Sequence, residues 1–568
     1  MVTCIDILKA LAIYWKTIFI IVYPLALLPI FLMNNTPAMR CLYVVVLMAG
    51  FWVLEVLPLA VTAMIPLALF PTMGILDTKK TSMAYFKDSN MMFVGGLIIA
   101  LAIEFCNLHT RISLHAIKLI GCSYRRLNFG LVTLTMLVSM WISNTAATAM
   151  MIPIIEAVLA ELEGQGLGRV FEKEENEDPE AEIDPQMQRP TRVTMCFYIG
   201  TAYAASIGGL GCIVGSGTNL ALKGIYETEF KDSPGVDFNK WLAANVPLMV
   251  AIMYPTWVWM QFWFMGLGRP NSADAKAINV GKEGEEVTRR VLSEKLHEMG
   301  RLSNHEVMVG IMFVFAVMLW FLRRPGFMKG WPEYITDTTV GDACAAMIVV
   351  VLLFIFPARL DFLHVFDKDE SKRPTAPSTG LITWRYIHQK MHWSLIFLMG
   401  GGFALADGIK NSGMGELVAD QLAAIAGLPR LSVLVLSSLM AMVVTQFTSN
   451  AAVANILLPI VASVAKVLIS INSRKILTFL QKAEVHPMYL MMPVCLACSF
   501  AFCLPVSTPP NAIAAAPCNM RTFEMIKVAS VIEVIAMVML IAIFPFLGSL
   551  IWDFETFPEW ARNTTETE

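Results

Sequence analysis

One polar motif occurs twice in this sequence, about 306 residues apart, inside segments that are otherwise apolar. The copies run from Ser143 to Pro153 and from Ser449 to Pro459, and each has a Ser-Asn opening, an apolar run and a closing Pro. The same offset maps Gly95-Gly96 onto Gly401-Gly402. A Ser-Asn pair in lipid-compatible sequence is costly unless it lines a protein-walled cavity. The repeat therefore predicts the two halves of one binding site.

Composition indicates a membrane protein without enzymatic chemistry. The 568 residues are 56% apolar and 15% charged, with a mean hydropathy of +0.62, whereas soluble proteins carry roughly a quarter charged residues. The net charge of −3 gives no indication of nucleic acid as a partner. The motifs contain no nucleophile beside a base and the histidines form no cluster. We therefore expect no enzyme, no metal site and no cofactor; a membrane-embedded enzyme or receptor is the alternative of another class.

Apolar segments of spanning length predict about 11 transmembrane helices. They lie near 17–33, 41–54, 56–71, 90–106, 196–222, 242–267, 305–322, 339–357, 393–407, 488–516 and 525–552. Two more apolar segments, 128–158 and 432–470, are interrupted by the Ser-Asn pairs and predict re-entrant hairpins; continuous helices with polar faces are the alternative. An odd number of spans between equivalent segments turns the two halves upside down relative to each other. The expected fold is an all-α polytopic membrane protein with inverted repeats.

Positive residues favour a cytoplasmic N-terminus. With this orientation the loops rich in Lys and Arg lie on the cytoplasmic side: 107–127, 159–195, 269–304, 358–391 and 519–527. The C-terminus is then extracellular, where Asn563-Thr564-Thr565 is an accessible N-glycosylation sequon. We expect a multi-pass protein of the plasma membrane.

Each half also contains a helix that cannot continue through its centre. Gly208 to Asn219 is rich in glycine, and Leu504 to Asn511 contains Pro509-Pro510. A kink satisfied by neighbouring hydroxyls is the alternative to a functional break. Helix N-termini, Asn amides and hydroxyls are donors for anions, and the four motifs contain no Lys or Arg. This pattern predicts a small anion held by dipoles and neutral donors.

Acidic residues in or beside the spans form a further group. Each is a candidate proton carrier or a structural partner of a neighbouring group: Glu55, Glu104, Asp342, Asp407 and Glu533.

Motifs along nearly the whole chain resemble the divalent anion/sodium symporter family, with INDY-type citrate and dicarboxylate transporters of insects as the nearest branch. They are Phe93-Val94-Gly95-Gly96, Asn107-Leu108-His109, Ser139 to Thr145, Gly401 to Ala406, and Pro505 to Ile513. The resemblance implies a homodimer whose protomers have a fixed scaffold domain and a mobile transport domain, which works as an elevator. It also implies citrate, succinate, malate and fumarate as substrates.

The same resemblance implies roles for particular residues. The hairpin tips that bind substrate carboxylates are Ser143, Asn144, Thr145, Ser449, Asn450 and Ala451. The loops associated with cations in sodium-coupled members contain Gly215, Ser216, Thr218, Asn219, Ser507, Thr508, Pro509 and Asn511. Because Thr145 keeps a hydroxyl where Ala451 has none, we expect the first hairpin to bind the ligand more tightly.

The chain then divides into five parts. Residues 1–127 form scaffold spans; 128–268 carry the first hairpin, an acidic insert (161–192) and the first broken helix; 269–304 form a charged cytoplasmic helix; 305–431 form scaffold spans; 432–568 carry the second hairpin, the second broken helix, the last span and the C-terminus.

Departures from the sodium-coupled pattern bear on the driving ion. Val214 stands where those relatives tend to have Thr, and Gln446 where vertebrate members tend to have Glu, so two oxygens near the cation loops are missing. Transport of a dianion still requires a co-transported cation or exchange for another dianion, because moving one charge across a membrane costs about 2.3 kcal/mol per 100 mV. We expect sodium-independent exchange, with protons as a further companion. A sodium-coupled symporter of the same substrates and a sulfate transporter of the same fold remain alternatives.

Overall fold

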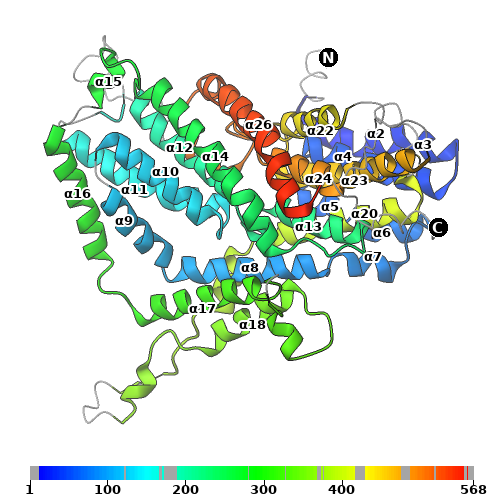
Figure 1. Ribbon diagram of the computed structural model, residues 1–568, viewed down its shortest axis with the longest axis horizontal. Helices are drawn as coiled ribbons and strands as arrows, with labels where there is room; N and C mark the ends of the chain where they lie inside the picture. Colours follow the sequence, from blue (N-terminus) through cyan, green and yellow to red (C-terminus); the bar gives the residue numbers. More distant parts are fainter. Residues whose placement is uncertain are drawn as a thin grey trace, which may run out of the picture.

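The computed structural model describes residues 12–554 and 560, except for 121–122, 166–168, 172–188, 279–280, 326–327, 367–372, 375, 416, 418–428, 475–485 and 517–519. Most of the acidic insert and the Asn563 sequon therefore lie outside the described residues. Apart from two isolated β-bridges, the regular structure of the described residues is helical (Figure 1). Seven of the described helices are long and apolar enough to cross a membrane. The prediction of an all-α polytopic membrane protein is confirmed, while the number of spans stays a prediction.

Most helices of the first half follow the predicted apolar segments, whereas α7 and α9 lie in stretches predicted to connect them. They are α2 (Trp15–Leu27), α3 (Pro29–Leu32), α4 (Pro37–Leu54), α5 (Leu59–Ala63), α6 (Ile65–Thr72), α7 (Thr78–Ala84), α8 (Asp88–Phe105), α9 (Leu108–Ile120), α10 (Tyr124–Ser139), α11 (Asn144–Gly164), α12 (Arg192–Gly208), the 3₁₀ turn η1 (Ile213–Gly215), α13 (Gly217–Glu229) and α14 (Phe238–Phe264). The span predicted at 56–71 is two short helices, since Pro66 has no N–H to continue α5 into α6.

The second half begins after two connecting helices. The connecting helices are α15 (Ala273–Ala277) and α16 (Gly281–Glu298). The second half contains α17 (Asn304–Phe321), η2 (Trp331–Tyr334), α18 (Asp342–Ile355), η3 (Asp361–His364), α19 (Trp384–Lys390), α20 (Trp393–Asn411), α22 (Arg430–Val444), α23 (Asn450–Arg474), α24 (Pro487–Ala497), α25 (Pro509–Ala515) and α26 (Thr522–Trp552). In Figure 1, α16 runs along one edge of the molecule beside α9, and it contacts both α9 and α11.

The two halves pack crosswise. Within each half the hairpin packs on the first arm of its own broken helix, α10 and α11 on α12, and α22 and α23 on α24. The second arm packs on the other half: α13 contacts α23 and α24, and α25 contacts α11 and α12. Each contact thus has a counterpart, as expected for two repeats related by an approximate two-fold axis.

Repeated glycines allow the same crossing nearer the N-terminus of each half. A Cβ on Gly95 of α8 would lie 2.6 Å from Ala346 Cβ on α18, and a Cβ on Gly401 of α20 would lie 2.8 Å from Ala63 Cβ on α5. Only glycine allows helices to approach this closely. The Gly-Gly pairs are therefore packing positions that join the halves.

Ion pairs between segments respect the predicted sides of the membrane. Arg111–Glu306 and Arg192–Asp274, at 2.7 Å each, join segments predicted to lie on the cytoplasmic side. Lys87–Asp407 (2.8 Å) and Lys466–Glu229 (2.5 Å) join segments predicted to lie on the extracellular side. Across the described part of the chain no ion pair mixes the two groups. The grouping supports the alternation of the predicted spans, without saying which side is the cytoplasm.

Candidate functional site

The first Ser-Asn motif forms the tip between α10 and α11. Ser143 is the N-cap of α11, and its Oγ accepts a hydrogen bond from Ala146 N at 3.2 Å. Ser139 Oγ, at the end of α10, lies 2.8 Å from Asn144 Oδ1 and 2.7 Å from the carbonyl oxygen of Ala205 on α12. One hydroxyl therefore fixes both the Asn side chain and the position of the tip on the broken helix.

The second motif repeats this arrangement between α22 and α23. Thr445 Oγ1 lies 2.8 Å from Asn450 Oδ1 and 2.6 Å from the carbonyl oxygen of Cys498, just after α24. In both tips Asn Oδ1 lies toward the hydroxyl, whose single proton is shared between this oxygen and the backbone carbonyl oxygen, so Nδ2 points away from the hydroxyl. Asn144 and Asn450 are half-buried, and their Nδ2 groups are candidate donors for an anion.

The Asn residues of the broken helices have a different task. Asn219 Nδ2 donates to the carbonyl oxygens of Gly209 and Cys212, both at 2.8 Å. Asn511 Nδ2 donates in the same pattern to Ala501 at 2.9 Å and Leu504 at 3.1 Å. Both side chains are fully buried. They satisfy carbonyl groups that the breaks leave without helical partners, so these amides hold the breaks in shape.

The two breaks meet in the interior. Thr218 Oγ1, in the first turn of α13, lies 3.1 Å from Ser499 Oγ, which follows α24. Tyr203 OH on α12 donates to the carbonyl oxygen of Phe502 at 3.0 Å. A Cβ on Gly217 would lie 3.6 Å from Ala451 Cβ, so the second tip packs on the start of α13. The structure therefore brings both tips and both breaks into one continuous site, with Ala451 buried in a contact between them.

The remaining predicted residues support the breaks. A Cβ on Gly215 would lie 2.7 Å from the Gly209 carbonyl oxygen, which explains the need for glycine. Ser216 is the N-cap of α13 and accepts from Thr218 N at 3.4 Å. Thr508 is the N-cap of α25, and Pro509 is the first residue of that helix. Thr145, like Asn144, is half-buried at the first tip.

Gln446 has a larger role than its sequence position indicated. Its Nε2 donates to the carbonyl oxygens of Met442 at 2.9 Å and Phe500 at 2.7 Å, and its Oε1 accepts from Cys503 N at 3.1 Å. Ser507 Oγ donates to the Gln446 carbonyl oxygen at 2.8 Å. Gln446 thus ties the second tip to the second break. The signal available in the sequence was the position of Gln446, three residues before the Ser449 motif. An amide buried there needs several hydrogen-bond partners.

Most of the intramembrane acidic residues have partners. Asp407 pairs with Lys87, Asp342 pairs with Lys223 and Arg323, and Tyr386 OH donates to Glu104 Oε1 at 3.2 Å. On Glu533 of α26 the buried Oε1 has no hydrogen-bond partner among the described residues, and the carboxyl lies beside Cys503, Phe502 and Gln446.

A helical membrane protein in which the Ser-Asn tips of two hairpins meet two broken helices has the architecture of a membrane transporter of the inverted-repeat type. The sequence profile of the sodium:sulfate symporter transmembrane region matches residues 9–553. The chain therefore belongs to the sodium:sulfate symporter family, which confirms the resemblance of its motifs.

Relatives are similar over almost the whole chain. Protein I'm not dead yet of Drosophila melanogaster is 41% identical over 559 residues, which cover 97% of this chain and 91% of the relative. The Na(+)/citrate cotransporter of Mus musculus is 33% identical, with 99% of each chain covered. Na(+)/dicarboxylate cotransporter 3 of Homo sapiens is 33% identical, covering 95% of this chain and 92% of the relative. Two of these three are named as cotransporters.

Proposed function

We propose that the protein carries citrate and the dicarboxylates succinate, malate and fumarate across the plasma membrane by an elevator movement, without catalysing a reaction. The observation that carries the proposal is the pair of amides, Asn144 and Asn450, each at the start of a helix and each held by a hydroxyl at the end of the preceding helix. Two sets of neutral donors suit an anion with two carboxylates, and release is easier than from a buried Arg. The names of the relatives support the same substrate class.

Uptake of labelled citrate into cells that express the chain tests this assignment. Asn144→Ala and Asn450→Ala should each abolish saturable uptake while the protein still reaches the surface. Asn411→Ala is a matched control, since this exposed amide donates only to the Asp407 carbonyl oxygen at 2.7 Å. Normal uptake by both tip variants would overturn the site.

We further propose sodium-independent exchange. The carbonyl oxygens of Met442 and Phe500, which a cation could coordinate, accept instead from the Gln446 amide. Reconstituted vesicles with choline in place of sodium, with and without internal dicarboxylate, separate the possibilities. Exchange should persist in choline and require internal dicarboxylate; loss of uptake in choline would establish sodium coupling.

Protons are the other companion, and Glu533 is the residue proposed to carry them. In vesicles without internal dicarboxylate, an inward proton gradient should then drive uptake by the parent chain and not by Glu533→Gln. Equal uptake by both chains would remove Glu533 from this role.

Sulfate is the second candidate substrate, because the matching family profile is described as a sodium:sulfate symporter. Competition decides between them: excess unlabelled succinate should inhibit labelled citrate uptake, and excess sulfate should not. The reverse result would favour sulfate.

The remaining proposals concern assembly and orientation. We propose a homodimer with cytoplasmic N-termini and extracellular C-termini, and a glycan on Asn563. Support comes from the family, the distribution of Lys and Arg, and the ion pairs that join only segments threaded to one side.

A further inference from the structure

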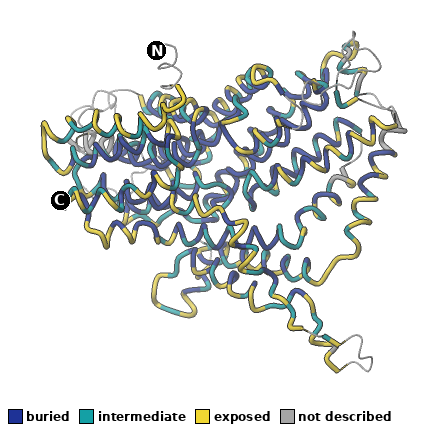
Figure 2. The backbone as a smooth tube through the Cα atoms, turned by 180° about the vertical axis from the view of Figure 1, so that it is seen from behind, coloured by how far each residue is buried: buried dark blue, intermediate teal, exposed yellow. Residues whose placement is uncertain are grey.

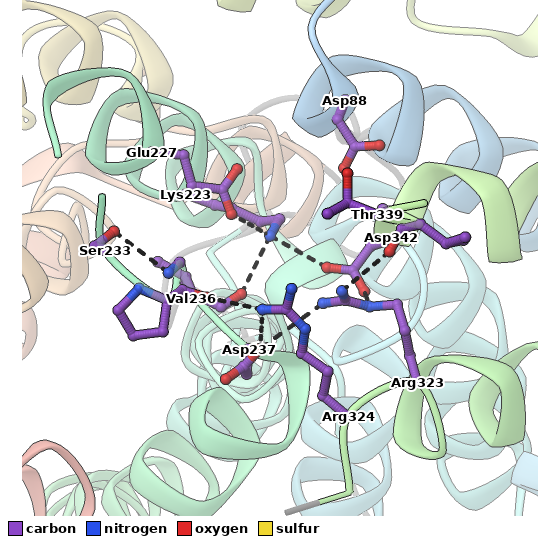
Figure 3. A pocket seen from close by; sticks show the side chains of 14 residues that line it. Asp88, Lys223, Glu227, Ser233, Val236, Asp237, Arg323, Arg324, Thr339 and Asp342 are labelled. Carbon is purple, nitrogen blue, oxygen red and sulfur yellow. Dashed lines mark hydrogen bonds and ion pairs between the residues drawn. The ribbon is translucent and has the colours of Figure 1, made fainter. Parts of the chain in front are cut away.

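A buried group of charged residues lies along the C-terminal half of α13, away from the helix break. Lys223, one turn beyond Asn219, is 3% exposed. Its Nζ lies 2.6 Å from Glu227 Oε1, 3.1 Å from Asp342 Oδ2 and 3.1 Å from the carbonyl oxygen of Val236. Figure 3 shows these side chains around a cavity of about 400 Å³. Asp342 is one of the acidic candidates predicted from the sequence, whereas Lys223 is not.

Asp342 links Lys223 to a second cation. It is the first residue of α18, is 1% exposed, and also pairs with Arg323, which follows α17. Arg323 in turn lies 3.8 Å from Asp237 Oδ1, just before α14. Asp342 thus stands between one cation on α13 and another beside α17.

This group spans the boundary between the two predicted domains. Lys223 belongs to residues 128–268, predicted to move, and Asp342 belongs to 305–431, predicted to be fixed. Lys87, the N-cap of α8, and Ser89 in its first turn add hydrogen bonds across the same boundary, to Thr228 Oγ1 at 2.7 Å and Glu227 Oε2 at 3.3 Å. By contrast, Glu229 on α13 pairs with Lys466 on α23, and both belong to the predicted transport domain.

Each partner of the Lys223–Asp342 pair has a second counter-ion on its own side of the boundary. Glu227 is on the same helix as Lys223, in the part predicted to move. Arg323 follows α17 and belongs, like Asp342, to the part predicted to be fixed. Separating a buried ion pair is strongly unfavourable when a charge is left alone. Here neither charge is left alone, and the adjoining cavity gives water a place to enter. A pair built in this way can open and close repeatedly.

We propose that the Lys223–Asp342 ion pair is a latch that holds the transport domain against the scaffold in the position seen here, and that it opens when the domain moves. The inference rests on the elevator movement proposed above. It assigns Lys223 and Asp342 a positioning role during transport, separate from binding of the substrate.

The latch predicts that Lys223→Met shifts the protein away from this position. The variant leaves Asp342 paired with Arg323 and leaves Glu227 partly exposed, so no isolated charge is buried. A cysteine at Thr145, on the half-buried first tip, reports the position through its rates of modification by an impermeant thiol reagent added from each side. Chains with Thr145 unchanged measure the contribution of the native cysteines.

We expect Lys223→Met to change the ratio of the two rates about tenfold, which is the effect of roughly 1.4 kcal/mol on a two-state equilibrium. Asp342→Asn, which keeps an acceptor for Arg323, should shift the ratio in the same direction and serves if Lys223→Met does not reach the membrane. Lys223→Arg should restore the parent ratio. The control is the double variant Glu229→Gln/Lys466→Met, which removes the ion pair within the transport domain from the same helix and should leave the ratio unchanged.

The outcomes separate the latch from the proposed substrate. An unchanged ratio in Lys223→Met or Asp342→Asn, or an equal shift in the control, overturns the latch even if the protein transports citrate. A shift only in the latch variants supports the latch even if citrate is not transported, because the labelling needs no substrate.

Discussion

At the scale of residues, two hydroxyl groups determine how the tips present their donors. Ser139 and Thr445 occupy equivalent positions and make equivalent pairs of contacts, one to an Asn oxygen and one to a carbonyl oxygen of the next helix. The motif predicted the importance of Asn144 and Asn450. It did not predict how they are oriented, because the carbonyl acceptors lie 66 and 53 residues away in sequence.

Removing either hydroxyl should weaken substrate binding. In Ser139→Ala and Thr445→Ala the freed amide can rotate, and a lost hydrogen bond of about 1–1.5 kcal/mol corresponds to roughly a tenfold rise in KM. Thr445→Ser keeps the hydroxyl and should retain the parent KM. Concentration series of labelled citrate measure these values. An unchanged KM in both Ala variants would show that the hydroxyls do not orient the donors.

At the scale of elements, the fold depends on glycine where a helix crosses a backbone. Gly208 ends α12, and a Cβ there would lie 2.2 Å from the Met136 carbonyl oxygen on α10. Gly164 ends α11 with nothing within 4 Å of the same position. The sequence singled out the stretch that begins at Gly208, but only the packing shows which of the two glycines has no room for a side chain.

These two glycines form a matched test of hairpin packing. Gly208→Ala should destabilise the protein by about 1–3 kcal/mol, because a backbone must shift to make room. Gly164→Ala should not lower stability, since alanine restricts the unfolded chain and favours helix. Thermal unfolding in detergent, followed by loss of the monodisperse peak, measures both. Equal melting temperatures would contradict the close contact between α10 and α12.

Sequence and structure agree most closely on the elements that repeat. The breaks were predicted at Gly208–Asn219 and Leu504–Asn511, and the tips from their Ser-Asn pairs. In the structure the second break begins earlier, after Ala497, and Pro509 is the first residue of α25. The crosswise packing of α13 on α23 and of α25 on α11 was not predicted. Apolar helix faces of similar composition can pair in several ways, so pattern alone does not choose the partner.

At the scale of the whole molecule, the ion pairs between segments fall into two groups that match the predicted sides of the membrane. If α26 ends outside, Asn563 is exposed to glycosylation enzymes. The expressed chain should therefore migrate faster on a gel after glycosidase treatment, and Asn563→Gln should migrate at that faster position without treatment. Asn34→Gln is the control, because the Asn34-Asn35-Thr36 sequon directly follows the predicted span 17–33 and is expected to lie too close to the membrane to be used. A parent chain that the glycosidase does not affect would contradict an extracellular C-terminus.

The first long helix, α2, stands apart from this interdigitated interior. It has no buried residue, and its main attachments are Tyr23 OH to the Val46 carbonyl oxygen at 3.0 Å and the packing of Phe19 near Phe51 (6.2 Å between ring centroids). Figure 2 shows the predominantly exposed surface of this part of the chain. For α2, acyl chains take the place that neighbouring helices take elsewhere. Its attachment should therefore depend on bilayer thickness and lipid composition, and during extraction with short-chain detergents it should be the first element to separate, before the tips or breaks are disturbed.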